Sequence, residues 1–311
     1  MAKTRILNKA IDASPQELFP KFVASQTAKG VSEKTIKTYY QHFHAIGKHI
    51  DLSKSFRELT KEDLDSTIVS MRRSGLAHNS ISSYARVFRT FLKWCRENGY
   101  TDLSLPNYKD KETVKETYTD EELEKLLRKP SANCDFCEYR NWTIINFLMN
   151  CGCRAATIRN IQNKDVDFAR KQVVFRHNKN GKTQCIPLCS FMVSILQNYM
   201  AIRKGAADDF LFCDMYGDML SEEALRNAVY RYNTQRGVQK TSIHLFRHTF
   251  ARKYLVDCGG DAFTLQRLLG HSTLNMTKHY CAIFDSDIAN NYDLHSPLAQ
   301  MQQSKQRITR K

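Results

Sequence analysis

Residues 242–284 read SIHLFRHTFARKYLVDCGGDAFTLQRLLGHSTLNMTKHYCAIF, and the rest of the chain is organised around them. They contain His244 and Arg247 three positions apart, a Leu-Gly-His sequence that ends at His271, and Tyr280 nine residues after it. A spacing of three places His244 and Arg247 on one face of a helix. Two imidazoles, a guanidinium and a phenol in one short helical region therefore indicate a chemically active site.

Composition limits the class of protein. The chain has 311 residues, 42% of them hydrophobic, so we expect one large domain or two ordinary ones. It has 47 Lys and Arg against 32 Asp and Glu, a net charge of +15. This excess favours a polyanionic partner, nucleic acid before an anionic membrane surface; a basic soluble protein with neither partner is the alternative.

No membrane or export signal is expected. No apolar run approaches the roughly 20 residues of a membrane-spanning helix, and residues 1–15 lack the apolar core of a secretory signal. We therefore predict a cytoplasmic protein with no membrane partner. Its ten cysteines are then expected to be reduced thiols.

Metal binding has one candidate. Cys134-x-x-Cys137 has the spacing of half a zinc site, but no second Cys or His pair at suitable spacing completes it. Cys151 and Cys153 lie at the end of an apolar helix and are expected to pack in the core. We predict no metal and no cofactor.

The first half predicts a helical bundle after a flexible basic arm at residues 1–13. Four helices are expected in a domain at 14–101, the first starting at a capping box of Ser14 and Glu17. The fourth, about 80–98, has a wide apolar face and a basic stripe. The candidate DNA contacts lie on the second and fourth helices: Lys34, Lys37, Arg86, Arg89, Lys93 and Arg96. A solvated charged surface without a DNA role is the alternative.

Residues 102–117 lack periodicity and alternate in charge, which indicates a linker. The second domain, 118–284, is expected to be mainly helical. Its first long helix is apolar and therefore buried, and it ends at Cys151-Gly152-Cys153-Arg154. Arg154 is either a surface cation at a helix end or a guanidinium directed into a site.

A small antiparallel sheet is expected within this second domain. Gln172–Arg176 and Gln184–Leu188 are predicted strands, joined by a turn at 178–182 whose Asn-Gly pair favours a hairpin. A further short strand is predicted at 209–213. Helices are expected on either side of it, at about 190–205 and 221–235.

The residue types fit cleavage of a DNA phosphodiester. Its transition state carries extra negative charge, which the forked guanidinium groups of Arg154 and Arg247 can bind with paired hydrogen bonds. A tyrosine nucleophile, Tyr280, would store the energy of the broken bond in a phosphotyrosine. Lys179, in the predicted turn, is positioned to protonate the leaving oxygen.

Two histidines complete the candidate site. His244 can assist proton transfer beside Arg247, and His271 can donate a hydrogen bond to the phosphate. Each residue alone has an ordinary interpretation as a packing or solvated side chain. The joint occurrence of these residues, in this order, favours the catalytic interpretation.

The order of motifs resembles the tyrosine recombinase (phage integrase) family, including the Xer recombinases, over about residues 14–300. The motifs that match are Gly152-x-Arg154, a hairpin lysine before Ile186-Pro187-Leu188, His244-x-x-Arg247-His248, Leu269-Gly270-His271 and Tyr280. The resemblance implies a mainly α fold. A four-helix, SAM-like core-binding domain and a mainly helical catalytic domain with a small antiparallel sheet would form a C-shaped clamp on DNA.

The resemblance also implies roles. Tyr280 would form a 3′-phosphotyrosyl linkage and release a 5′-hydroxyl. Lys179 would be the general acid; Lys182 competes for this role, but counting back from Ile186-Pro187-Leu188 favours Lys179. The implied catalytic residues are Arg154, Lys179, His244, Arg247, His271 and Tyr280. Two rounds of exchange through a Holliday junction would take place in a homo-tetramer on two DNA sites, without a cofactor.

The sequence departs from the family pattern in two places, while its tail fits that pattern. Thr157 stands where the family often has an acidic residue, and Cys151-Gly152-Cys153 replaces the more usual Thr-Gly-Leu. Within the tail, 285–311, residues 285–300 would form a short helix that docks on a neighbouring protomer, or one that folds back on its own domain.

Several alternatives stay open at this point. The protein is either a mobile-element integrase or an Xer-type resolvase of chromosome dimers. A type IB topoisomerase, working as a monomer, would use the same chemistry, and a DNA-binding protein that has lost catalysis is a third possibility. The DNA target and any accessory protein or partner recombinase are not readable from the sequence.

Overall fold

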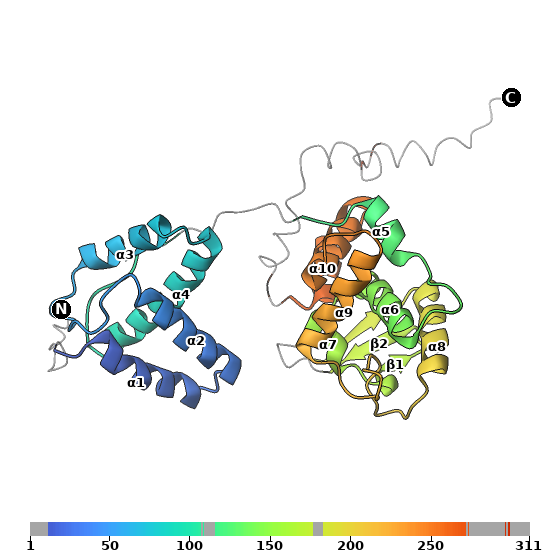
Figure 1. Ribbon diagram of the computed structural model, residues 1–311, viewed down its shortest axis with the longest axis horizontal. Coiled ribbons are helices and arrows are strands. Elements are labelled where there is room, and N and C mark those ends of the chain that lie inside the picture. The colour runs from blue at the N-terminus through green and yellow to red at the C-terminus, as the bar shows by residue number, and fades with distance from the viewer. Residues whose placement is uncertain are drawn as a thin grey trace. The chain divides into compact units, whose positions relative to one another are not determined.

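The computed structural model describes residues 12–106, 108, 116–176, 183–271, 273, 296 and 298. Its internal contacts divide the chain into two units, Met1–Thr113 and Val114–Lys311, each with its own colours in Figure 1. The division falls inside the predicted linker. Within the described residues, no helix is long and apolar enough to cross a membrane.

The first unit contains four helices: α1 (Pro15–Ala28), α2 (Glu33–Ile46), α3 (Lys61–Arg73) and α4 (His78–Glu97). The predicted start of α1 is confirmed. The Ser14 side chain accepts a hydrogen bond from the Glu17 backbone N–H at 3.2 Å, and the Glu17 carboxylate accepts one from the Ser14 N–H at 2.9 Å. Both bonds satisfy backbone donors that the first turn of a helix leaves without intrahelical partners.

Aromatic side chains form the core of this unit. Phe19 of α1 stacks on Phe43 of α2 with ring centroids 3.7 Å apart, and Phe43 meets Phe91 of α4 edge-on at 5.6 Å. Leu105 is also buried in this core, and the Tyr108 hydroxyl lies 2.8 Å from His78 Nδ1. The chain therefore stays packed on the first unit beyond residue 102, where the predicted linker begins.

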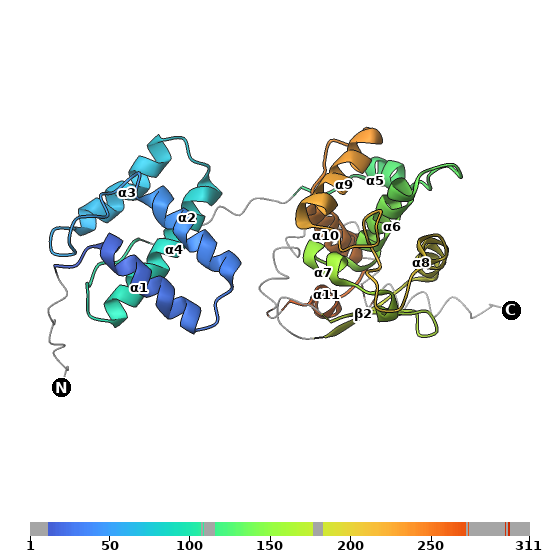
Figure 2. The ribbon, with the colours of Figure 1, turned by 60° about the horizontal axis from the view of Figure 1, so that its bottom comes forward.

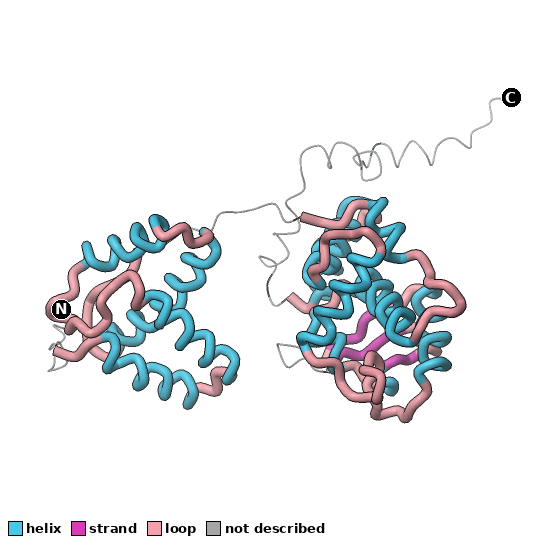
Figure 3. The backbone as a smooth tube through the Cα atoms, viewed as in Figure 1, coloured by secondary structure: helices cyan, strands magenta, loops and turns pink. Residues whose placement is uncertain are grey.

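The second unit is mainly helical (Figure 3). Its α-helices are α5 (Asp120–Leu127), α6 (Phe136–Cys151), α7 (Ala155–Asn160), α8 (Ser190–Arg203), α9 (Glu222–Gln235), α10 (Ile243–Arg252) and α11 (Ala262–Leu269). Helix α6 is buried on nearly all sides, because α5, α8, α9 and α10 pack around it. Such burial is what its apolar sequence predicts.

A three-stranded antiparallel sheet completes the second unit, in the order β1 (Val166–Asp167), β2 (Gln172–Phe175), β3 (Gln184–Pro187). Val173 is paired with Ile186, and both side chains are buried. Helix α11 lies beside the sheet (Figure 2), where Gln184 of β3 donates a hydrogen bond to the Leu268 carbonyl at 2.9 Å. The mainly α fold with a small antiparallel sheet is confirmed.

The strand predicted at 209–213 is wrong. Phe210 makes only an isolated bridge to Gln162, and Cys213 one to Met219. Leu211 and Phe212 of this apolar segment are fully buried. A short apolar run is compatible with a buried irregular segment as well as with a strand. The third strand is instead β1, whose two residues are too few to show a periodicity. The predicted turn at 178–182 lies outside the described residues.

Candidate active site

Arg154 lies just after the turn that ends α6. Gly152 caps this helix with a left-handed φ of 55°, and its N–H donates to the Leu148 carbonyl at 2.8 Å. A Cβ at position 152 would lie 2.4 Å from Phe250 Cδ1. The glycine thus allows both the turn and the close approach of α10. Arg154 follows as the half-buried N-cap of α7.

Arg247, on α10, joins two motifs that are far apart in the sequence. Its side chain is buried, with the whole residue only 4% exposed. Nη1 donates to the Gly152 carbonyl at 2.9 Å, and Nη2 donates to the Leu269 carbonyl at 2.9 Å. A charged donor makes strong hydrogen bonds in such surroundings, so Arg247 holds the ends of α6 and α11 together.

His271 lies against the same guanidinium. Its Nε2 is 2.8 Å from Arg247 Nη2. Because arginine has no acceptor, Nε2 must accept the hydrogen bond, so the neutral ring carries its proton on Nδ1. Burial, together with the charges of Arg247 and Arg154, lowers the pKa of His271 to about 4. The lowered pKa favours the neutral imidazole near pH 7, and the charges of both arginines contribute to it after burial.

Two glutamines that the sequence did not single out fix the turn before His271. Gln184 Nε2 donates to the Leu268 carbonyl at 2.9 Å and also to the Arg267 carbonyl. Gln266 Nε2 donates to the His271 carbonyl at 3.2 Å, while the His271 N–H donates to the Gln266 carbonyl at 3.0 Å. Such side chain to backbone bonds have no periodic signature, so no pattern in the sequence could have revealed them.

The remaining predicted catalytic residues divide into two groups. His244 lies in the first turn of α10 with an exposed side chain, one turn before the buried Arg247. Lys179, Lys182 and Tyr280 lie outside the described residues. The structure thus places Arg247 in contact with His271, with Arg154 close enough for its charge to act on the same imidazole, and it places His244 on the helix that carries Arg247.

The six candidate DNA contacts of the first unit differ in exposure. Four are exposed and two, Arg89 and Arg96, are half-buried; the exposed ones are Lys34, Lys37, Arg86 and Lys93. Arg96 Nη1 donates to the Leu103 carbonyl at 3.0 Å, so it holds the chain that follows α4. Their DNA-binding role remains a prediction, and Arg96 also has a structural role.

The cysteines around Gly152 pack in the core, as predicted. Cys151 is fully buried and Cys153 is 4% exposed. Burial raises the pKa of the Cys151 thiol, which keeps it protonated. Thr157, at the position where an acidic residue is common, is buried as well. In the described part of the chain, no three His, Cys, Asp or Glu side chains are grouped so that they could hold a metal ion.

The buried Arg247 and the imidazole of His271 form an electropositive site in a mainly helical unit, which suits an anionic group such as a phosphate. Residues 116–286 match the family model described as "Phage integrase family". The chain therefore belongs to the phage integrase family. It is a tyrosine recombinase, an enzyme of DNA strand breakage and rejoining.

Curated relatives and solved structures agree with this family. The chain is 28% identical to tyrosine recombinase XerC of Bacillus licheniformis over 295 residues, which cover 88% of this chain and 94% of the relative. It is 26% identical to tyrosine recombinase XerD of Staphylococcus haemolyticus, over 91% of this chain and 98% of the relative.

Two solved structures share the fold. The Tn1549 transposon integrase in complex with a circular intermediate DNA has a TM-score of 0.72 and 20% identity, and the match covers 90% of this chain and 99% of that one. A lambda integrase tetramer bound to a Holliday junction has a TM-score of 0.70 and 14% identity, over 90% and 80% of the two chains.

Proposed function

We propose that this recombinase cleaves DNA through a 3′-phosphotyrosyl intermediate on Tyr280 and exchanges strands through a Holliday junction. The observation that supports this most is the buried Arg247, which binds the turns at Gly152 and Leu269 and touches a neutral His271. The partners of Arg247 are two backbone carbonyls and an imidazole, none of which neutralises its positive charge. This arrangement suits a phosphate whose negative charge grows in the transition state.

The two arginines are assigned to the non-bridging phosphate oxygens. The bonds of Arg247 to Gly152, Leu269 and His271 do not use its Nε–H or its second Nη1–H. We assign these donors to a phosphate oxygen, and Arg154 to the other oxygen. Arg247 is already held in place before DNA binds, so little reorganisation is needed when the charge develops.

Proton transfer is assigned to the remaining side chains. Tyr280 attacks the phosphorus, the bond to the 5′ oxygen breaks, and Lys179 protonates that oxygen. His244, exposed on α10, assists the transfer of the Tyr280 proton. His271 stays neutral and donates a hydrogen bond from its Nδ1–H to the phosphate. The 5′-hydroxyl of a partner duplex then attacks the phosphotyrosine, the bond from Tyr280 to the phosphorus breaks, the phenol regains its proton, and the DNA backbone is restored.

The assembly is proposed by analogy with relatives. The two units would clamp duplex DNA, with the basic residues of α2 and α4 on its backbone. Four protomers would act on two recombination sites, as the lambda integrase tetramer is bound to a Holliday junction. The tail at 285–311 would dock on a neighbouring protomer. Integration or excision of a mobile element and Xer-type dimer resolution are both compatible with this assembly.

The alternative is DNA relaxation by a monomer of the type IB topoisomerase kind. Deleting residues 285–311 separates the two, because a monomeric enzyme needs no segment docked on a neighbour. We expect the truncated protein to cleave DNA but not to recombine it. Recombination at the full-length rate would contradict docking in trans.

Covalent trapping tests the proposed chemistry. Sheared DNA of the source organism first identifies a bound site; that site is then prepared as a suicide duplex with a nick beside the cleavage position. We expect the wild type to form an adduct that survives denaturation by SDS, and Tyr280→Phe to form none while it still binds the duplex. An adduct with Tyr280→Phe, or none with the wild type on a tightly bound site, would contradict the proposal.

A further inference from the structure

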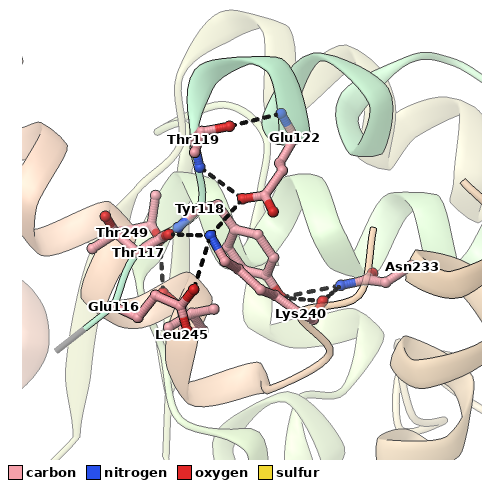
Figure 4. Close-up of polar contacts among 9 residues, drawn as sticks. All are labelled: Glu116, Thr117, Tyr118, Thr119, Glu122, Asn233, Lys240, Leu245 and Thr249. Atoms are coloured by element: carbon pink, nitrogen blue, oxygen red, sulfur yellow. Dashed lines mark hydrogen bonds and ion pairs between the residues drawn. The ribbon is translucent and has the colours of Figure 1, made fainter. Parts of the chain in front are cut away.

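Lys240 lies in the loop between α9 and α10, four residues before His244, and it binds the start of the second unit (Figure 4). Its Nζ donates to the Thr117 carbonyl at 3.0 Å and to the Glu122 carboxylate at 2.9 Å. The Glu116 carboxylate is 3.2 Å from the same nitrogen. One ammonium group therefore holds both the chain that enters the second unit and the first turn of α5.

These contacts are not ordinary surface ion pairs. The side chains of Lys240 and Glu122 are only 20% and 23% exposed. The hydrogen bond to Glu122 raises the pKa of Lys240, so the ammonium is favoured over the neutral amine. Glu116, at 68% exposure, is the weaker partner. A partly desolvated, hydrogen-bonded ammonium fixes geometry better than a solvated one does.

Tyr118 makes a second connection to the same loop. Its hydroxyl donates to the Lys240 carbonyl at 3.1 Å and accepts from Asn233 Nδ2 at 3.0 Å (Figure 4). Asn233 Nδ2 also donates to the Lys240 carbonyl at 2.7 Å. Both the side chain and the carbonyl of Lys240 are therefore held.

A third connection reaches α10 itself. The Tyr118 N–H donates to Thr249 Oγ1 at 2.9 Å, and the Thr249 hydroxyl donates to the Leu245 carbonyl at 2.8 Å (Figure 4). The Tyr118 ring packs on Phe246, with centroids 4.3 Å apart. Phe246 directly precedes Arg247, so these contacts fix α10 next to the candidate catalytic residue Arg247.

We propose that Lys240 is a positioning residue of the recombinase: it fixes Glu116–Thr119 to the loop before α10 and thereby sets the orientation of His244 and Arg247. The inference rests on the proposed role of these two residues at the phosphate. The same contacts connect the catalytic helix with the chain that leads to the first unit. Lys240 itself touches neither DNA nor a reacting atom in this assignment.

The test compares Lys240→Met with Lys240→Arg. Methionine keeps much of the side-chain volume but has no donor, whereas arginine keeps the charge and the donors. On a suicide duplex at saturating protein, we expect Lys240→Met to form the covalent adduct about tenfold more slowly, since a small misplacement of catalytic groups is costly. The Kd for the duplex should stay within about twofold, and Lys240→Arg should recover most of the rate.

A matched control and a double variant distinguish positioning from general stability. Lys164→Met removes a lysine that is paired with Asp208 in the same unit, and it should cleave at the wild-type rate. In a His244→Ala background, Lys240→Met should cost clearly less than the roughly tenfold that it costs alone, because one of the two groups that it positions is gone. An equal loss in both backgrounds, or a Lys240→Met rate within about twofold of the wild type, overturns the inference.

The outcomes also separate this inference from the proposed chemistry. If the wild type forms the Tyr280 adduct and Lys240→Met forms it equally fast, only the positioning role fails. If the wild type forms no adduct, the proposed function fails first. Should Lys240→Met not fold, Tyr118→Phe removes the two hydroxyl bonds, one to the Lys240 carbonyl and one from Asn233 of α9. A wild-type cleavage rate in that folded variant counts against the inference.

Discussion

Lowering the pH from 7 to 5 should destabilise the second unit through His271. The pKa of this imidazole is lowered from 6.5 to about 4 in the folded protein. Between these values the unfolded chain binds a proton that the folded protein does not. The contribution of neutral His271 to the stability of the fold is therefore fully present above pH 6.5 and is lost as the pH falls towards 4. The two pKa values give a loss of about 2 kcal/mol at pH 5 relative to pH 7.

His271→Gln is the comparison that isolates this effect. Glutamine does not titrate, and its side-chain oxygen can still accept a hydrogen bond from Arg247. The chain has two tryptophans: Trp94 lies on α4 of the first unit, and Trp142 lies on α6 of the second. In a Trp94→Phe background, urea unfolding followed by tryptophan fluorescence therefore reports on the second unit alone.

The quantity to compare is the change in free energy of unfolding between pH 7 and pH 5. We expect the wild type to lose about 2 kcal/mol more than His271→Gln, while contributions from carboxylates cancel between the two proteins. Equal losses in the two proteins would refute the burial of a neutral His271 beside Arg247. A larger loss in His271→Gln would contradict the sign of the pKa shift.

Three further substitutions test the fold and the first unit. Gly152→Ala should lower the free energy of unfolding by about 2–4 kcal/mol, because φ is positive and the new Cβ meets Phe250; an unchanged Tm would contradict the close approach. Arg96→Met should lower the stability of the first unit by about 1–3 kcal/mol, through loss of its bond to Leu103. Lys37→Met, on an exposed position, should instead leave Tm unchanged and weaken DNA binding with a smaller salt dependence, measured by fluorescence anisotropy; salt dependence equal to the wild type would remove Lys37 from the interface.

Periodicity and capping made most of the helices predictable. The capping box at Ser14 marked the start of α1, and the mostly apolar sequence before Gly152 marked α6 as buried. Strand-like residues on both sides of an Asn-Gly pair predicted the two longer strands. Where burial did not coincide with regular structure, as at Leu211 and Phe212, the same apolar signal gave a strand that does not exist.

The candidate site was predictable only as a set of residues. The sequence identified Arg154, Arg247 and His271, but not that Arg247 would join two backbone turns. Nor did it distinguish the exposed His244 from the buried Arg247, although both lie on one helix. The supporting contacts of Gln184 and Lys240 connect segments that are distant in sequence, and no local pattern encodes such pairs.

The attachment of DNA to Tyr280 is the central claim, and peptide mapping of the trapped adduct tests it most directly. The adduct on a suicide duplex is digested with nuclease and protease, and the peptides are sequenced by tandem mass spectrometry. We predict a nucleotide joined through its 3′-phosphate to Tyr280, on no other residue. A nucleotide on another side chain, or a 5′-phosphate linkage, would contradict the account.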